Sequence, residues 1–494
     1  MQEKTQVLVI GGGPAGSTAA TLLVRQGFDV VLLERDFFPR EHIGESLIPA
    51  SIPIWELTGA REKVEAYGFV KKYGLHFNWG PDAWSSVWGV PGEPDARHAY
   101  QVVRAEFDQL LLEHAKSEGV RVREGVEVTS LAFDGDRPIS AAWKERAVEE
   151  RSGEVSFDYL VDASGRTGIM STRYLRNRRF NKAFQSVAAW GYWKNVQAPP
   201  ETPVGGVTIG AVPDGWVWGI PLHNGTMSVG LVLHKETFKA KRETSGTLEQ
   251  TYLDGIMESP LFEKALRDAE QVSGIQAEQD FSYVSEESSG PGYFMIGDAA
   301  CFLDPLLSSG VFLATYSALL AAASISSLHR GEVTEEEASS YFHLTYRQAY
   351  VRFMLVLTSM YQNYRGKTSL FWQIKQLTRE DVHDTDIMQA FERLVTGAED
   401  VRFAREGSGT LHVEQVQQFV NQAFHRARGS SRKAVMQMPD ELREQRIADV
   451  NVINSPLEMS LSPDTAIGGL YVRTEPTLGL SRTEAASALE ATPA

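Results

Sequence analysis

Cysteine is almost absent from this chain, which has one, Cys301, among 494 residues. One thiol cannot form an intramolecular disulfide, and it cannot supply the ligands of an iron–sulfur cluster or a cysteine-ligated zinc site. The His-x-x-x-His spacing of many metal sites is missing as well, so we predict no metal site. A chain without disulfides fits a reducing compartment, and we expect a cytoplasmic protein.

Positive charge and long apolar segments are also scarce. Lys and Arg number 48 against 64 Asp and Glu, a net charge of −16, which disfavours nucleic acid as the main partner. The longest apolar run, 311–325, is too short and too rich in Ser and Thr to span a bilayer, and the N-terminus lacks the basic and apolar regions of a signal peptide. We therefore predict a buried core helix at 311–325 and no membrane partner.

A glycine-rich turn lies between two short apolar segments at the start of the chain. Residues 6–10 read QVLVI, a helical stretch follows the turn, and DVVLLE ends at Glu34. Strand, glycine turn, helix, strand and acid form the pattern of a dinucleotide-binding unit, in which the backbone approaches a pyrophosphate and the acid accepts from a ribose hydroxyl. A tight turn without a ligand is the alternative. We predict cofactor contacts from Gly11, Gly13, Pro14, Ala15, Gly16 and Glu34.

Later segments extend this pattern. GESL occupies 44–47, QVVRAEFDQLLLEHA passes from strand to helix at 101–115, LVDASG lies at 160–165, and GDAA follows a strand at 297–300. In this order they resemble FAD-dependent monooxygenases. The resemblance implies an α/β fold, with a Rossmann-like FAD domain, a mixed β-sheet substrate region and C-terminal helices. It also implies FAD contacts from Arg35, Arg40, Ser46, Arg104, Asp162 and Asp298.

The stretch WVWGIP at 216–221 points to one particular family among these FAD-dependent enzymes. Trp-x-Trp-x-Ile-Pro, placed between the 160–165 and 297–300 segments, is the signature of flavin-dependent halogenases, and the chain resembles that family from Met1 to about Asp400. The family has an essential lysine a few residues before an aromatic residue and a tryptophan. Lys72 fits that position best and Lys71 is the alternative. Successive residues of a strand face opposite sides, so only one of the two should reach the site.

The resemblance implies a specific chemistry. Reduced FAD and O2 would oxidise chloride or bromide to hypohalous acid, which would travel through the protein to Lys72 and then to the substrate. The lysine could act as an ammonium that hydrogen-bonds hypohalous acid or as an amine that forms a haloamine. The backbone amides of Ser309 and Gly310, which precede the apolar helix, are candidates for the halide site.

The tryptophan motif is interpreted as a wall between flavin and substrate. Period two places both indoles on one face of a strand, where their bulk would prevent direct hydroxylation of the substrate. An indole has one donor and no acceptor, so we expect no direct chemistry from it. Core packing of an aromatic strand is the alternative interpretation. The predicted wall consists of Trp216, Trp218, Ile220 and Pro221.

Substrate and partners are implied by the same resemblance. Tryptophan halogenases have a glutamate at the position of Leu307, so this chain resembles the branch that acts on phenolic or pyrrolic rings, either free or tethered to an acyl or peptidyl carrier protein. No second dinucleotide fingerprint is present, and we expect FADH2 from a separate flavin reductase. The alternative function is an FAD-dependent hydroxylase or a geranylgeranyl-reductase-like enzyme.

We expect a core at 1–330 that contains the FAD-binding region and the substrate-side sheet. A helical region at 331–430 should cover the substrate pocket, with an aromatic stripe that includes Tyr346, Tyr350 and Tyr364. Such a stripe most often packs in a core. The Ser-, Pro- and Thr-rich stretch 431–494 should form an extended, partly disordered tail.

Overall fold

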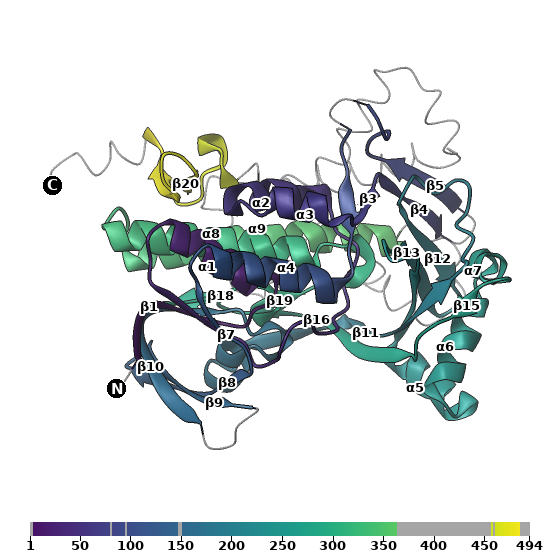
Figure 1. Cartoon of the computed structure of the whole chain (residues 1–494), viewed down its shortest axis with the longest axis horizontal. Coiled ribbons are helices and arrows are strands. Elements are labelled where there is room, and N and C mark those ends of the chain that lie inside the picture. Colours follow the sequence, from purple (N-terminus) through teal and green to yellow (C-terminus); the bar gives the residue numbers. More distant parts are fainter. Residues whose placement is uncertain are drawn as a thin grey trace, which may run out of the picture.

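The computed structural model describes residues 3–79, 82–93, 96–146, 151–362, 456–457 and 460–484. It confirms the predicted α/β class: two large sheets lie against a layer of helices (Figure 1). The first sheet contains the predicted nucleotide-binding strands, and its strands follow the spatial order β17-β18-β10-β1-β2-β7. Its central strands are parallel, and β8 and β9 extend it in antiparallel fashion from β10. The bounds are β1 (Glu3–Ile10), β2 (Val30–Leu33), β7 (Arg121–Arg123), β8 (Val126–Asp134), β9 (Arg137–Glu145), β10 (Ser152–Asp162), β17 (Ser289–Gly290) and β18 (Tyr293–Met295).

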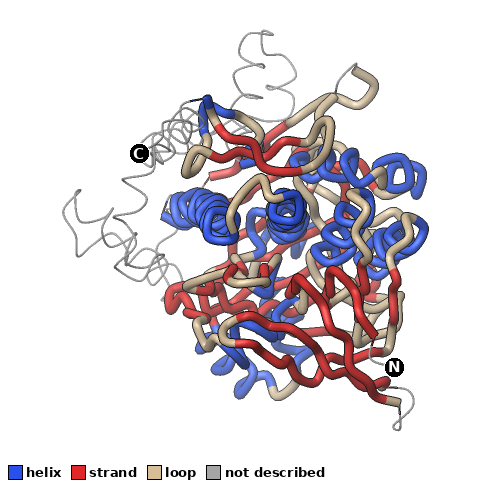
Figure 2. The backbone as a smooth tube through the Cα atoms, turned by 90° about the vertical axis from the view of Figure 1, so that its left-hand side faces the viewer, coloured by secondary structure: helices blue, strands red, loops and turns tan. Residues whose placement is uncertain are grey.

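Helices cover one face of this sheet, as Figure 2 shows end-on. The glycine turn leads directly into α1, which packs against α8 and α4. The helix α8 is long and apolar enough to cross a bilayer, so the expectation that this segment is too short was wrong. Its most apolar window is 94% buried, which confirms the predicted core helix, because a membrane span would face lipid. The helices are α1 (Pro14–Arg25), α2 (Ile52–Thr58), α3 (Arg61–Tyr67), α4 (Arg104–Ser117), α8 (Gly310–Arg330) and α9 (Glu335–Gln362).

The second sheet is mainly antiparallel and follows the order β19-β16-β11-β14-β13-β12-β4-β5, with β15 paired to β11. The WVWGIP stretch is its strand β13, between β12 and β14. Helices α5 (Lys235–Ser245), α6 (Leu248–Met257) and α7 (Pro260–Ala265) cover its outer side (Figure 1). Its strands are β4 (Gly74–Trp79), β5 (Asp82–Val87), β11 (Arg178–Lys194), β12 (Val207–Val212), β13 (Gly215–Pro221), β14 (Met227–His234), β15 (Glu270–Gln271), β16 (Gln276–Ser285) and β19 (Cys301–Phe302).

A two-stranded ribbon joins the sheets to the helical layer. It pairs β3 (Val70–Lys72) with β6 (Ala99–Gln101), and Lys72 lies opposite Ala99. Within β3, Lys71 is exposed and Lys72 is buried, as expected for alternating side chains. The ribbon therefore directs Lys72, and not Lys71, into the protein.

The C-terminal part differs from the prediction. Within the predicted tail, β20 (Leu470–Arg473) and β21 (Gly479–Arg482) form an antiparallel hairpin that packs on α8 (Figure 1). Its apolar side chains join the main core, so the prediction of an extended tail was wrong for this stretch. In α9 the predicted aromatic stripe, including Tyr346 and Tyr350, is buried core, whereas Tyr364 lies outside the described residues.

Candidate functional site

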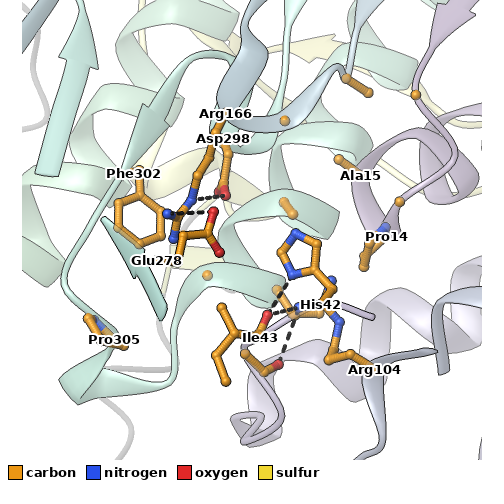
Figure 3. Close-up of a pocket in the computed structure, with 18 of the residues that line it drawn as sticks. Pro14, Ala15, His42, Ile43, Arg104, Arg166, Glu278, Asp298, Phe302 and Pro305 are labelled. Carbon is orange, nitrogen blue, oxygen red and sulfur yellow. Dashed lines mark hydrogen bonds and ion pairs between the residues drawn. The ribbon is translucent and has the colours of Figure 1, made fainter. Parts of the chain in front are cut away.

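A cavity of about 460 Å³ lies where the first sheet, the second sheet and the starts of α1 and α8 meet. Side chains from these distant segments point toward one another across it (Figure 3). Most of the residues predicted from the sequence line it: Gly11, Gly13, Pro14, Ala15, Glu34, Arg35, Arg40, Ser46, Arg104, Trp216, Trp218, Ile220, Asp298, Ser309 and Gly310. Outside the lining are Gly16, Lys72, Asp162 and Pro221.

The glycine turn forms the cavity's nucleotide end. Gly11 has a φ of +106°, and a Cβ there would collide with the carbonyl oxygen of Ala163. A Cβ on Gly16 would collide with the carbonyl of Gly11, so Gly16 lies behind the turn and lets the helix approach the strand. No side chain caps the first turn of α1, so its backbone N–H groups remain available for an anion.

Glu34 closes this end of the site. Its carboxylate accepts hydrogen bonds from the backbone N–H of Gly12 at 2.6 Å and of Asp36 at 2.8 Å. The side chain is buried yet lines the cavity, so it retains lone pairs for a ribose hydroxyl. The uncapped helix start, the glycine cradle and the buried acid together fit the adenosine diphosphate half of FAD.

Arginines supply positive charge beside the glycine turn. Arg104 binds the fully buried Asp108 through two nitrogens, at 2.7 and 2.9 Å, and Arg40 lies 3.7 Å from the same carboxylate. The Nη1 of Arg104 also donates to the carbonyl of Ile43 and so holds the loop that carries Ser46. Arg35 donates to the Thr167 hydroxyl at 3.1 Å across the cavity.

Asp162 needs a correction. Its Oδ1 accepts from the backbone N–H and hydroxyl of Ser164, and its Oδ2 accepts from the N–H of Met170 at 2.7 Å. The side chain is fully buried and does not line the cavity, so this aspartate shapes the lining loop 163–167 and is not placed to touch a cofactor. The sequence could not show this, because a carboxylate after a strand can also bind its own loop.

The opposite end of the cavity holds an ionic cluster. Arg166 pairs with Glu278 at 3.0 Å, approaches Asp298 at 4.0 Å and covers the ring of Phe302 at 4.3 Å (Figure 3). Burial raises the pKa of Asp298, and Arg166 and Arg104 oppose that rise. Sequence reasoning missed Arg166 and Glu278, although Arg166 follows the quoted LVDASG directly.

The turn before α8 is a candidate anion site. Ser308 adopts a positive φ of 55°, and Ser309 is the N-cap of α8 without making a side-chain cap bond. The buried Ser309 Oγ has no hydrogen-bond partner among the described residues. The turn thus presents an unpaired hydroxyl and a helix N-terminus to the cavity.

The tryptophan pair forms one wall of the cavity. The indoles of Trp216 and Trp218 lie 5.9 Å apart on the same face of β13, as predicted. Trp216 Nε1 donates to the Tyr361 hydroxyl at 2.9 Å, and that hydroxyl lies 2.9 and 3.0 Å from the Asp304 carboxylate. Asp304 caps the short helix before the Ser309 turn by accepting from the Leu306 N–H, so the wall and the turn are physically linked.

Pro221, the last residue of the motif, does not line the cavity. It is the last residue of β13, opposite Met227 of β14, and the predicted wall therefore stops at Ile220. Tyr361 and Asp304 were not predicted as parts of the wall. Tyr361 lies 145 residues from Trp216 and 57 residues from Asp304 along the chain, and no local pattern could have shown these contacts.

Lys72 lies beyond the cavity lining, with 1% of its surface exposed. Its Nζ donates to Ser46 Oγ at 2.7 Å and to the Leu47 carbonyl at 3.0 Å, and it lies 4.9 Å from the ring of Trp88. No carboxylate pairs with it in the described part of the chain. Burial lowers the pKa of Lys72 to about 7, because the charged form loses its hydration.

Known proteins resemble the chain over nearly its whole length. The tryptophan halogenase family model matches residues 6–96 and 89–430. A tryptophan 2-halogenase of Chondromyces crocatus is 42% identical over 503 residues, covering 98% of this chain and 95% of that protein. The sulochrin halogenase of Aspergillus terreus is 38% identical over 393 residues, covering 74% and 71%.

Solved structures agree with this relationship. The flavin-dependent halogenase CmlS is 30% identical with a TM-score of 0.75, over 98% of this chain and 86% of that one. The myxobacterial chondrochloren halogenase CndH, an FAD-dependent enzyme, is 33% identical with a TM-score of 0.72, over 85% and 97%. These likenesses favour halogenation over the alternative hydroxylase or reductase. The chain belongs to the flavin-dependent halogenase family and is a flavin-dependent halogenase.

Proposed function

We propose that this halogenase uses O2, FADH2 and chloride or bromide to make hypohalous acid in the cavity, and that Lys72 directs it onto an electron-rich ring. The observation that carries the proposal is the environment of Lys72. A lysine that is 1% exposed and has no carboxylate partner in the described residues contributes little to stability, because burial penalises its charge. A role in chemistry explains its position.

The residues around the cavity would divide the work. The glycine turn, Glu34 and the arginines would bind and orient FAD, and when bound the reduced flavin would supply two electrons for the reaction of O2 with the halide. The unpaired Ser309 hydroxyl and the amides at the start of α8 would hold the halide. These roles agree with the charges involved, because the arginines and the helix N-terminus are positive and the phosphates of FAD and the halide are negative.

Lys72 would receive the oxidant through Ser46. Ser46 lines the cavity, and its hydroxyl accepts a hydrogen bond from the buried Nζ. It is therefore the shortest described link between the cavity and the lysine. With a pKa of about 7, Lys72 can serve as an ammonium donor or as a neutral amine near neutral pH.

Trp216 and Trp218 would keep the reacting flavin away from the substrate. Both indoles are at least 95% buried, and their nitrogens are engaged with Tyr361 and Ser228, so their rings are fixed. Fixed, apolar rings would exclude water and substrate from the flavin side without taking part in the chemistry.

The substrate we propose is a phenolic or pyrrolic ring, either free or tethered to a carrier protein. Leu307 supplies no carboxylate to activate a poorly reactive ring, and a ring with its own hydroxyl or N–H needs less activation. An indole is the second candidate, favoured by the relative named tryptophan 2-halogenase. We further propose that a separate reductase delivers FADH2, because no second dinucleotide fingerprint follows the first.

The test supplies FAD, a flavin reductase, NADH, O2 and bromide or chloride, with phenol, pyrrole, tryptophan and carrier-bound substrates in parallel. Mass spectrometry should reveal the isotope pattern of a halogenated product with the phenolic or pyrrolic compounds. A product that gains oxygen in place of halogen would contradict the proposal. NAD(P)H oxidation without any added reductase would contradict the separate partner.

A further inference from the structure

Glu45 is a buried acid that the proposed chemistry does not yet use. It lines the cavity, is 1% exposed, and neither carboxylate oxygen accepts a hydrogen bond of ordinary geometry among the described residues. It immediately precedes Ser46, the partner of Lys72. An isolated buried carboxyl is costly, so its retention beside the site calls for a reason.

Two hydroxyl groups of the second sheet affect the ionisation of this carboxyl. Ser228 on β14 and Tyr192 on β11 are directly opposite each other in the sheet, and both hydroxyls act on Glu45 to lower its pKa. Ser228 already accepts from Trp218 Nε1 at 3.2 Å, so its own hydrogen is free to point at Glu45. Ser228 thus affects the ionisation of Glu45 and also holds the indole of Trp218.

Tyr192 also forms a hydrogen bond with an exposed carboxyl. Its hydroxyl donates at 2.7 Å to Oε1 of Glu41, which is exposed and lines the cavity. Burial raises the pKa of Tyr192, and the buried Glu45 and the exposed Glu41 add to that rise. Carboxyl, hydroxyl and carboxyl in sequence form a short chain of groups that can both give and accept protons.

Charges around Glu45 set its protonation. Burial and the neighbouring Glu41 raise the pKa of Glu45 to about 7, and Arg104 acts in the opposite direction. His42, in the same loop, has a pKa lowered to about 3 by burial and by Arg104, and so stays neutral near pH 7. Glu45 therefore carries a proton below about pH 7 and loses it above.

The proposed halide oxidation requires a proton. One O2, one halide ion, the two electrons and two protons of the reduced flavin, and one further proton yield one hypohalous acid and one water. That further proton must enter a cavity closed on one side by Trp216 and Trp218. A buried group that can be reloaded from solvent meets the need.

We propose that Glu45 delivers this proton and that Tyr192 reloads it from Glu41, an inference that rests on the proposed function. Glu45 gives its proton to the oxygen that leaves as water and becomes a carboxylate. A proton from solvent then reaches the exposed Glu41, which gives it to the Tyr192 oxygen while the Tyr192 hydroxyl hydrogen passes to Glu45. Glu41 is left as the carboxylate it was at the start, so charge and protons balance.

The test measures coupling, which is the share of the supplied FADH2 recovered as oxidised halide and not as hydrogen peroxide. Because Lys72 titrates in the same range, it is done in a Lys72→Met background with taurine as the trap for hypohalous acid. Without further change, coupling should be high at pH 6 and fall above about pH 7. Adding Glu45→Gln should lower it at least about 10-fold and remove the pH dependence.

Two more variants keep the test decisive if Glu45→Gln misfolds. Tyr192→Phe should lower coupling by about 3- to 10-fold, because the ring stays and the relay hydroxyl is lost. Glu45→Ala should regain activity with added formate, which a purely structural role would not produce. Glu286→Gln, an exposed glutamate paired with Arg179, is the matched control and should change nothing.

The outcomes separate the two proposals. Unchanged coupling and an unchanged pH profile in Glu45→Gln and Tyr192→Phe, in a chain that halogenates, would overturn the relay alone. Absence of any halogenated product from the unmodified chain would overturn the proposed function. Full loss of coupling with no formate rescue and no change in Tyr192→Phe would also overturn the relay.

Discussion

Ser46 Oγ lies 2.7 Å from Lys72 Nζ, and this hydrogen bond is the described link between the cavity and the buried lysine. Ser46 belongs to the GESL stretch, whose residues serve both sides: Glu45 lines the cavity, and Leu47 offers its carbonyl to the lysine. Residues 45–47 therefore connect the cavity, where we propose that the halide is oxidised, with Lys72, where we propose that the oxidant is passed to the substrate.

Ser46→Ala should shift the pH dependence of halogenation. The hydroxyl accepts from the charged form of Lys72, and its loss costs that form about 1.5 kcal/mol. The pKa of Lys72, already lowered to about 7, should fall by about one further unit, so the inflection in the rate profile moves to lower pH. Steady-state rates from pH 5 to 9 measure the shift. Ser46→Thr keeps the hydroxyl and should leave the inflection in place, and a shift in both variants would contradict the assignment.

Gly13→Ala and Gly16→Ala should separate cofactor binding from folding. A Cβ on Gly13 comes no closer than 3.3 Å to Arg40, and its φ of −67° suits any residue, so the free protein should keep its melting temperature within a few degrees. The methyl group would occupy the space needed by the pyrophosphate, and FAD affinity should fall about 10-fold or more. Gly16→Ala should destabilise the chain without cofactor. Fluorescence titration with FAD and thermal melting test both, and equal FAD affinity in Gly13→Ala would contradict the placement.

Replacing both indoles of the wall should change the product before it stops turnover. Trp216→Phe with Trp218→Phe keeps apolar rings but removes the hydrogen bonds to Tyr361 and Ser228, worth about 1 kcal/mol each. FAD binding should weaken, and oxygenated substrate should appear beside halogenated substrate in the mass spectrum. Trp55→Phe is the matched control, because the buried Trp55 does not line the cavity. A double variant that simply unfolds would favour the packing interpretation.

The nucleotide end of the site could be predicted from local sequence. Gly11, Gly16 and Glu34 lie within one βαβ unit, where spacing along the chain fixes position in space. Local sequence was also sufficient for Lys71 and Lys72. Because side chains alternate along a strand, only one of the two could be buried, and Lys72 is the buried one. The tryptophan pair was likewise placed correctly on one face of a strand.

The errors share a physical cause. Asp162 ends a strand and Asp298 follows one, but the oxygens of Asp162 bind the residues that come next in the chain, Ser164 and Met170, which depends on the backbone conformation there. Pro221 shares a motif with Trp216, yet it is at the end of the strand, where the cavity has ended. The links from Trp216 to Tyr361 and from Glu45 to Tyr192 join distant segments and follow only from the packed structure.

The most direct test of the account compares Lys72→Met with Lys71→Met. Both remove an ammonium group and keep an unbranched side chain, but only Lys72 is buried beside Ser46. The measurement is the rate of halogenated product formation at pH 7 with saturating FADH2, alongside FAD affinity. We predict a loss of about 100-fold or more for Lys72→Met, with FAD affinity unchanged, and a rate within about twofold of the unmodified chain for Lys71→Met. Halogenation by Lys72→Met at the unmodified rate would contradict it.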